Sequence, residues 1–396
     1  MRKILNLNLL LLSLLLSCEG PAASLPSAEE TRPVLETYAR ILHGMYEDSL
    51  LRGQALGRAI EAFLSGPSEE ALMQARSAWT ASRRPYMQSE FARFYGGPID
   101  DPENDIDARL NSWPLDEAFI DYVLGPPPDF QEIMSGLINE PERLPQITKE
   151  ALLRLNGAGG EENVTLGYHA IEFLLWGQDF DDNGPGRRPA SDYIDGRRAN
   201  ADRRRQFLRA TTELLLEDLS ALEDAWREGS ADNYRARFIS LGPKEGLTRV
   251  FTGLVNMAGF ELAHERLLVP YRTAEQEDEH SCFSDTTLED HIDNQKGIEA
   301  IYIGRYERID GRLIEGPSIS ELVRARDPGL DREIRQAMRE AMEAIRAIPA
   351  PFDRAIREEP GRPKVKAASE AVAKEAELLK RAAERLGISV TLLGGE

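Results

Sequence analysis

Apolar residues recur every three to four positions along most of this chain, and clusters of proline and glycine separate the stretches that carry the pattern. This spacing places the apolar side chains on one face of an α-helix, and strong helix formers fill the positions between them. The apolar positions of the clearest stretches are Val34, Tyr38, Ile41 and Met45; Phe207, Thr211, Leu214, Leu215, Leu219 and Leu222; Leu247, Val250, Leu254 and Met257; and Ile334, Met338, Met342, Ile345 and Ile348. We therefore predict an all-α protein.

Two segments interrupt the helical pattern. Residues 179–189, with the sequence DFDDNGPGRRP, predict a hinge between two halves of the chain. Each half carries enough long helices for an antiparallel bundle, so we expect one bundle over residues 31–180 and a second over residues 190–396. Residues 301–314 alternate loosely around an Asp-Gly pair, which predicts a small β-hairpin attached to the helices.

The first residues resemble an export signal. Arg2 and Lys3 precede an apolar run over residues 4–16, which is too short to cross a bilayer as a stable helix. The run ends in Leu-Leu-Ser-Cys, which resembles the bacterial lipobox. We therefore expect residues 1–17 to be removed as a signal peptide and Cys18 to carry a lipid. The alternative is an ordinary secretory signal that is cut a few residues later.

A lipidated Cys18 sets the expected location of the mature protein. Glu19 follows it, and by resemblance to lipoprotein sorting this residue permits passage to the outer membrane. Residues 18–30 are expected to form a flexible tether, and no later segment is apolar and long enough to span a membrane. Cys282 is then the one free thiol, so no intrachain disulfide is expected. We expect a lipoprotein anchored to the outer membrane, on its periplasmic or its surface face.

Composition narrows the class of partner. The 396 residues include 48 Lys and Arg against 68 Asp and Glu, which gives a formal net charge of −20. Binding to phosphates depends on basic side chains, so a nucleic-acid partner is excluded. An acidic surface suits cationic ligands, although solubility is the simpler explanation.

The first candidate site is a histidine–glutamate pair. His169 and Glu172 lie three residues apart in a helix predicted over residues 161–176, so both side chains project from one face and could share a cation. A simple His–Glu hydrogen bond is the alternative. Glu261 and His264 form a mirrored pair in the second half, and such pairs hold metals in ferritin-like bundles. A polar helix edge is the alternative for this second pair.

Carboxylates beside large aromatic residues provide further candidate oxygen ligands, namely Glu90, Asp116 and Glu117. Asp116 and Glu117 are equally well explained by the start of a helix after Pro114, where carboxylates are favoured. As ligands, these oxygens would favour iron or another borderline-to-hard cation over copper.

An acidic loop over residues 275–285 is the third candidate. It gathers five carboxylates, one histidine and one thiol within eleven residues, among them Asp278, Glu279, His280 and Cys282. Such a set could ligate a metal. A solvated acidic loop is the alternative.

Three blocks of sequence together resemble the imelysin family, which is named for an insulin-cleaving membrane protease. Gly167 joins His169 and Glu172 in a G-x-H-x-x-E motif. The blocks LNSWPLDEAFIDYV, TLGYHAIEFLLWGQDF and QEDEHSCFSD resemble the iron-regulated protein A branch. The resemblance implies two four-helix bundles with the site between them, an outer-membrane or periplasmic location and a link to iron acquisition. It also implies a metal-ligand role for His169 and Glu172.

No hydrolase motif accompanies this resemblance. None of the five histidines is followed four residues later by another histidine, so the HExxH helix of zincins is absent. We expect a lipid-anchored binding protein of iron physiology that holds a metal ion such as Fe or Zn, haem or an iron chelate. Envelope iron-uptake proteins are the expected partners. A metal-dependent peptidase of the imelysin type and an envelope adaptor without a ligand are the alternatives.

Overall fold

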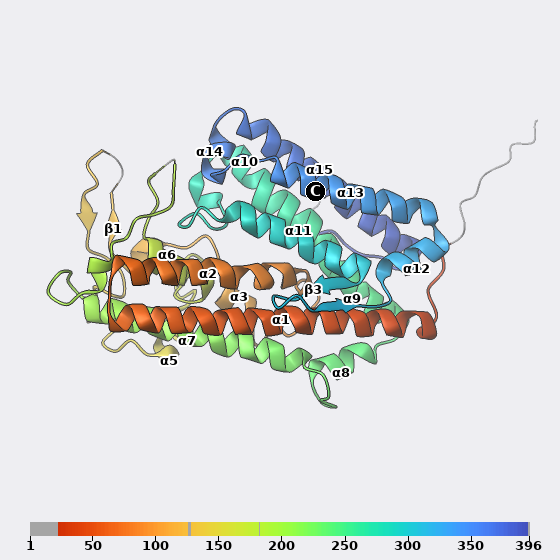
Figure 1. Ribbon diagram of the computed structural model, residues 1–396, viewed down its shortest axis with the longest axis horizontal. Coiled ribbons are helices and arrows are strands. Elements are labelled where there is room, and N and C mark those ends of the chain that lie inside the picture. The colour runs from red at the N-terminus through yellow and green to blue at the C-terminus, as the bar shows by residue number, and fades with distance from the viewer. Residues whose placement is uncertain (1–22, 126–127, 182, 395–396) are drawn as a thin grey trace, which may run out of the picture.

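The computed structural model describes residues 23–125, 128–181 and 183–394, and the long segments of this part are helices arranged in two groups (Figure 1). The first group comprises α1 (Ala28–Ser65), α2 (Glu69–Ser89), α3 (Asp107–Leu110), α4 (Glu117–Ile120), α5 (Lys149–Leu155), α6 (Gly167–Trp176), α7 (Ala201–Trp226) and α8 (Tyr234–Ile239). The second comprises α9 (Pro243–Asn256), the π-helix η3 (Met257–Leu268), α10 (Val269–Thr273), α11 (Thr287–Ile303), α12 (Ile319–Arg326), α13 (Pro328–Arg346), α14 (Phe352–Arg357) and α15 (Gly361–Arg385). Short 3₁₀ turns are η1 (Glu90–Ala92), η2 (Ala190–Tyr193) and η4 (Gln276–Asp278).

Long helices form the frame of both groups. In the first group α1 packs against α2 and α7, and α6 packs on α2 and α7. In the second, α15 contacts α13, α9 and η3, while α11 packs against α13. The groups meet where α2 contacts α11 and α1 contacts α9, and one hydrophobic core continues through both. The predicted all-α class with packed helical bundles is therefore confirmed.

The start of α1 shortens the expected tether. Ser27 accepts a hydrogen bond from the backbone of Glu30, and the Glu30 carboxylate accepts one from the backbone of Ser27, which is a complete capping box. The helix therefore begins at Ala28, inside the segment 18–30 that was expected to be a tether. The expected signal peptide and the lipidated Cys18 lie outside the described residues.

The boundary between the groups follows α8. The expected hinge at residues 179–189 precedes α7, yet α7 packs on α1 and α6. The reason is its apolar face, which includes Phe207, Leu215 and Leu222 and is buried against the first group. The chain thus crosses to the second group between α8 and α9.

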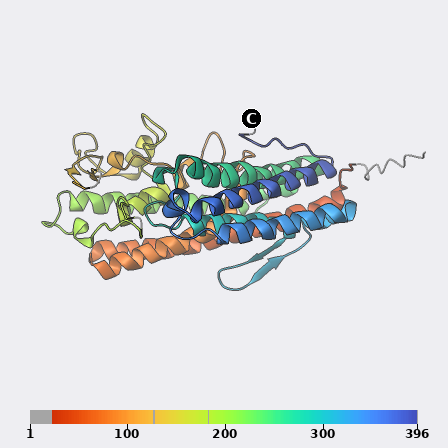
Figure 2. The ribbon, with the colours of Figure 1, turned by 90° about the horizontal axis from the view of Figure 1, so that it is seen from above.

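Two small hairpins accompany the helices. Strands β3 (Arg305–Glu307) and β4 (Leu313–Glu315) form the hairpin predicted around the Asp-Gly pair, and it projects from the side of the molecule (Figure 2). Strands β1 (Val123–Leu124) and β2 (Glu132–Ile133) form a second antiparallel pair, which the apolar pattern did not predict.

The helix predicted over residues 161–176 is shorter than expected and begins at Gly167. The preceding Thr165 is tied to α5, because its backbone N–H donates to Asn156 and its hydroxyl donates to the carbonyl of Leu152. These bonds hold the chain extended up to Leu166. Within the described ranges, none of the helices has both the length and the hydropathy needed to cross a bilayer.

Candidate functional site

Gly167 determines where helix α6 begins, and with it the position of the histidine–glutamate pair. Its φ is +80°, which glycine adopts without strain. A Cβ here would lie 2.5 Å from the carbonyl oxygens of Arg109 and Leu110, at the end of α3. Because that atom is missing, α6 starts directly against α3. This contact brings His169, in the first turn of α6, next to Asn111, which follows α3.

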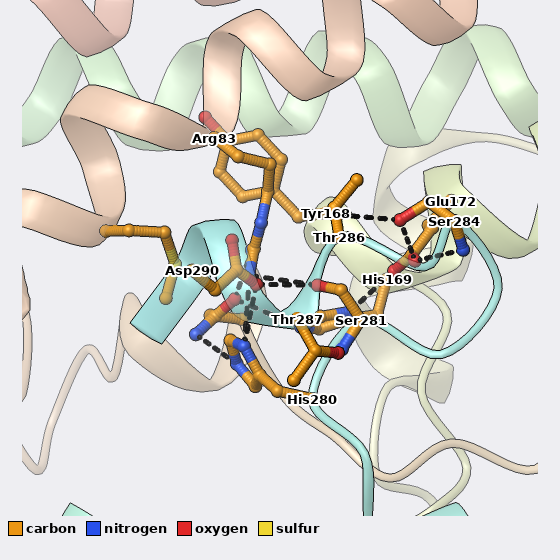
Figure 3. A network of polar contacts seen from close by, with 12 residues as sticks. Arg83, Tyr168, His169, Glu172, His280, Ser281, Ser284, Thr286, Thr287 and Asp290 are labelled. Carbon is orange, nitrogen blue, oxygen red and sulfur yellow. Dashed lines mark hydrogen bonds and ion pairs between the residues drawn. The ribbon is translucent and has the colours of Figure 1, made fainter. Parts of the chain in front are cut away.

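His169 is buried, and both of its ring nitrogens are engaged. Nδ1 lies 2.9 Å from Oε2 of Glu172, and Nε2 lies 3.1 Å from Oδ1 of Asn111. Oε1 of Glu172 accepts hydrogen bonds from the backbone N–H and the hydroxyl of Ser284, at 2.9 and 2.6 Å (Figure 3). The pair is therefore inside the protein, tied to a loop of the second group.

A second imidazole, His280, comes from the opposite group, in the loop between η4 and α11. Its Nδ1 lies 2.8 Å from Oδ2 of Asp290, and its Nε2 lies 3.3 Å from Nδ2 of Asn111. The rings of His280 and His169 meet edge to face, with 4.8 Å between their centroids. Each imidazole is thus held at Nδ1 by a carboxyl group, and both turn Nε2 toward the same amide.

The amide of Asn111 assigns the proton of His169. Its Oδ1 accepts a hydrogen bond from the guanidinium of Arg83, so Oδ1 also accepts from Nε2 of His169, which must carry the ring hydrogen. Nδ1 of His169 is then an acceptor, and Glu172 supplies the hydrogen between them. Burial raises the pKa of Glu172 to about 8, which agrees with a protonated carboxyl group near neutral pH.

The same amide assigns the opposite tautomer to His280. Nδ2 of Asn111 donates to Oε1 of Glu90 at 2.9 Å and also faces Nε2 of His280. His280 therefore has its hydrogen on Nδ1 and donates it to Asp290. Its Nε2 directs a lone pair at Asn111.

Two buried arginines balance the carboxylates of this centre. Arg83, on α2, donates to Asp290 at 2.6 Å, and Arg266, on η3, binds the two oxygens of Glu90 at 2.8 and 2.9 Å. Burial opposes ionisation of Glu90, but Arg266 overcomes it and the pKa of Glu90 falls to about 2. Both ion pairs connect the first group to the second.

Burial and these arginines keep both imidazoles neutral. The pKa of His169 is well below its ordinary value, first because of burial and then because of Arg83. The pKa of His280 is lowered in the same way by burial and then by Arg266. Neutral imidazole is the form of histidine that ligates metals.

The chemistry of this donor set suits a metal ion, but the donors do not yet surround one point. Metal-binding imidazoles almost always have their other nitrogen held by a carboxylate or a carbonyl, as His169 and His280 do. Among the residues that the structure describes, no three His, Cys, Asp or Glu side chains stand in the arrangement of a metal centre. The Asn111 amide occupies the space between the two Nε2 atoms. A metal ion therefore fits once Asn111 moves aside or becomes a ligand itself.

Trp113 separates this centre from a large surface cavity. Its ring packs edge to face on His280, with 5.0 Å between centroids. Trp113 also lines a cavity of about 860 Å³, together with Ser112, Asn156 and Glu162. This volume lies within the range of small-molecule pockets, roughly 300 to 1,000 Å³.

Four residues proposed from the sequence meet at the centre: Glu90, His169, Glu172 and His280. Asp116 and Glu117 lie elsewhere, at the start of α4. Asp116 is the N-cap of that helix and accepts from the backbone N–H of Ala118 at 3.0 Å. Burial raises the pKa of Glu117 to about 7.

The mirrored pair Glu261 and His264 does not form. These residues lie in η3, a π-helix whose i→i+5 bonds widen each turn, so that residues three apart no longer share a face. Glu261 is buried against Arg266 at 2.7 Å, at the edge of the centre. His264 is half-exposed and pairs with Glu265.

The acidic loop is only partly solvated. It contributes His280, Ser281 and Ser284 to the centre. Asp278 ends η4 and is half-buried. Glu279 is buried in a separate group of carboxylates, and burial raises the pKa of the partly buried Cys282 thiol well above its ordinary value.

Sequence reasoning missed four residues of the centre: Arg83, Asn111, Arg266 and Asp290. One signal was present, because Arg83 lies four residues after Trp79 and three before Tyr86, on the buried stripe of α2. A charged residue on an apolar stripe is rarely buried unless it is paired. No local pattern points to Asn111 or Asp290, which become neighbours only through the packing of α2, α3 and α11.

The comparisons with known proteins agree with the fold. A family model described as Imelysin, and named as a peptidase, matches residues 42–379. Iron-regulated protein A of Synechococcus elongatus is 22% identical over 381 residues, which are 92% of this chain and 91% of that protein.

Two crystal structures resemble the whole molecule. One is of an iron-regulated protein A precursor from Parabacteroides distasonis, with a TM-score of 0.70 and 20% identity over 93% of this chain and 98% of that chain. The other is of an imelysin-like protein from Psychrobacter arcticum, with a TM-score of 0.67 and 13% identity over 94% of this chain and 99% of that chain. At these identities the likeness concerns the fold.

Proposed function

The chain belongs to the imelysin family, and from this membership we propose that it is an exported binding protein of iron physiology. It holds a metal ion or an iron-bearing ligand between its two helix groups, and Cys18 anchors it to the outer membrane. One observation supports the site above all others. His169 and His280 come from opposite groups, each is held at Nδ1 by a carboxyl group, and both direct Nε2 at Asn111.

The proposal revises the role of the motif glutamate. His169 and His280 are the nitrogen ligands, and Glu90, whose Oε1 lies 2.9 Å from Nδ2 of Asn111, supplies a carboxylate oxygen. Glu172 orients His169 from behind, as Asp290 orients His280. Two imidazoles and one carboxylate form a donor set that suits iron or zinc.

Binding is coupled to a proton in this scheme. Nε2 of His169 must lose its hydrogen to act as a ligand, and Nδ1 then takes the hydrogen that Glu172 holds. One proton leaves the protein, and the resulting Glu172 carboxylate is stabilised by the two hydrogen bonds from Ser284. Because the pKa of Glu172 is about 8, affinity should rise with pH up to that value.

The closed centre favours binding over hydrolysis. A catalytic zinc site keeps one open position for water and substrate, whereas His169 and His280 are each 2% exposed. The Asn111 amide fills the space between them, so this arrangement has no open position of that kind. The peptidase in the family model's name therefore stays an alternative, as does a ligand-free adaptor.

The test is metal and haem binding by the mature protein, purified without an affinity tag. Elemental analysis and titrations with Fe(II), Fe(III), Zn(II) and haem are run on the wild type and on His169→Ala. His264→Ala is the matched control, because His264 is half-exposed and lies outside the centre.

We expect about one equivalent of one of these ligands in the wild type and in the control, with a loss of at least tenfold in affinity for His169→Ala. Equal affinity in all three proteins would overturn the site. Zinc-dependent cleavage of an unfolded protein substrate, abolished by a chelator, would favour the peptidase instead.

A further inference from the structure

A second group of carboxylates lies where three distant segments meet. The segment after α6 contacts the loop before α11 through a hydrogen bond from the backbone N–H of Gly186 to the carbonyl of Phe283, at 2.9 Å. Gln276 of the same loop donates to Asp179 at 2.8 Å. From α14, Arg354 donates to Asn183 at 3.2 Å.

The segment after α6 has the spacing of a calcium-binding loop. Asp179, Asp181, Asn183 and Gly184 follow the pattern D-x-D-x-N-G, which in EF-hands supplies the first oxygen ligands and the glycine of the sharp turn. The glutamate that completes such a loop six residues after the glycine is absent, since that position is Ala190. A carboxylate from elsewhere in the chain must replace it.

The other two segments provide carboxyl groups near this loop. Glu279 is only 1% exposed, and neither of its carboxyl oxygens makes a hydrogen bond of normal geometry, although the Thr287 hydroxyl lies beside it. The negative charges of Asp353, Asp285 and Asp179 add to the effect of burial and raise the pKa of Glu279. One oxygen of Asp285 is likewise buried without a partner. Buried carboxyl groups of this kind are costly unless a cation or a donor compensates them.

We propose that this junction is a calcium site, formed by Asp179, Asp181, Asn183, Asp285 and Glu279. The side-chain donors are all oxygens, which suit Ca²⁺ and not a transition metal. Calcium accepts six to eight oxygens in a flexible geometry, so backbone carbonyls and water complete the shell. The site differs in chemistry and in residues from the pair of imidazoles, and it does not rest on the proposed function.

The side chains of the proposed site can rearrange around a calcium ion. Within the described part of the chain no three acidic or histidine side chains already converge as ligands, so the ion must draw them together. Asp181 is paired with Arg187, and Asn183 with Arg354. The side chains of these arginines are 77% and 45% exposed, so they can turn to solvent when calcium replaces them. A cavity of about 420 Å³, lined in part by Asp179 and Asp181, gives a hydrated ion access.

Calcium at this place would fix the loop that carries part of the histidine centre. Ser284, which binds Glu172, lies between Phe283 and Asp285. The ion would hold this loop against the segment after α6. Its effect would be to order the junction of the two helix groups.

The experiment is equilibrium dialysis of the chelator-treated mature protein against ⁴⁵Ca²⁺ up to about 10 mM, with Mg²⁺ as competitor. The double variant Asp179→Asn/Asp285→Asn removes two negative charges from the site with little change in shape. The matched control, Glu70→Gln/Glu377→Gln, removes two exposed charges on α2 and α15. Circular dichroism checks folding, and Asp181→Asn replaces the double variant if that one does not fold.

We expect saturable binding of about one equivalent with a Kd on the order of 0.1 to 1 mM, as in extracellular calcium modules. The control should keep this affinity, and the double variant should lose at least tenfold. His169→Ala should also keep it, which separates this site from the proposed iron centre. No saturable binding in the wild type, or equal binding in the double variant, would overturn the proposal.

Discussion

At the scale of single residues, Asn111 determines what the centre can do. Its carbonyl oxygen accepts from Arg83 and His169, while its amide nitrogen donates to Glu90 and faces His280. One side chain thus gives the two imidazoles different tautomers. A serine or an alanine here could not do so, because neither presents an acceptor and two donors in one plane.

Replacing Glu172 by Gln tests the proton assignment. The pKa of Glu172 is about 8 in the folded protein and 4.5 without the fold, so the folded state binds more protons between these values. The contribution to stability is complete below about pH 4.5 and is lost as the pH rises to about 8. Glutamine reproduces the protonated group, since its amide can donate to His169 and accept from Ser284.

We expect the wild type to lose stability relative to Glu172→Gln between about pH 5 and pH 8, by about 1.4 kcal/mol for each unit of pKa shift. Urea unfolding of both proteins at the two pH values measures this difference. Parallel pH profiles would mean that Glu172 is ionised in the folded protein.

At the scale of elements, the start of α6 positions the motif. Glycine is required at position 167 of the G-x-H-x-x-E motif for two reasons: its φ is positive, and the carbonyls of α3 approach it closely. Gly311, in the β3–β4 turn, has a similar φ of +82° but open space where a Cβ would be. The two glycines therefore separate the backbone effect from the packing effect.

We predict that Gly167→Ala destabilises the protein by several kcal/mol, because backbone strain and a clash add together. Gly311→Ala should cost only about 1 kcal/mol, from backbone strain alone. Denaturant unfolding measures both values. Similar losses in the two variants would show that contact with α3 does not position α6.

The helices could be predicted from the sequence, whereas several details of their ends could not. Apolar spacing identified the faces of α1, α7, α9 and α13 because each is amphipathic over many turns. The spacing cannot distinguish η3 from an α-helix, and so it did not reveal that Glu261 is buried whereas His264 is half-exposed. Thr165 stopped the helix before Gly167 through bonds to α5, which are tertiary contacts.

For the site as well, the sequence identified individual residues but not their arrangement. Side chains that can ligate a metal stood in unusual local patterns, and these patterns identified His169, Glu172, Glu90 and His280. Their arrangement required the packing of α2, α6 and α11, which no local pattern contains. The contacts of Glu172 with Nδ1 of His169 and with Ser284 likewise became visible only in the structure.

At the scale of the whole molecule, buried ion pairs join the two helix groups. Arg266 of η3 reaches Glu90 at the end of α2 with two hydrogen bonds, and both side chains are fully buried. A buried pair adds little net stability when intact, but removing one partner leaves an uncompensated charge. The junction is thus sensitive to the loss of either charge.

Arg266→Met should therefore destabilise the protein by about 3 to 5 kcal/mol, since Glu90 stays buried without its main partner. Adding Glu90→Gln should recover part of the loss. The control is Arg381→Met, whose exposed pair with Glu333 should contribute less than about 1 kcal/mol. Thermal or urea unfolding compares these variants, and Glu90→Gln alone, with the wild type. If the double variant is as unstable as the sum of both single changes, the two residues are not coupled.

The central claim is that imidazoles from both groups bind one ligand, and His280→Ala tests it most directly. Calorimetric titration with Fe(II) under anaerobic conditions, or with the ligand that the wild type binds best, gives affinity and stoichiometry together. The account predicts that His280→Ala loses at least tenfold in affinity, as does His169→Ala. Unchanged binding by His280→Ala, beside a loss in His169→Ala, would contradict a site shared between the two groups.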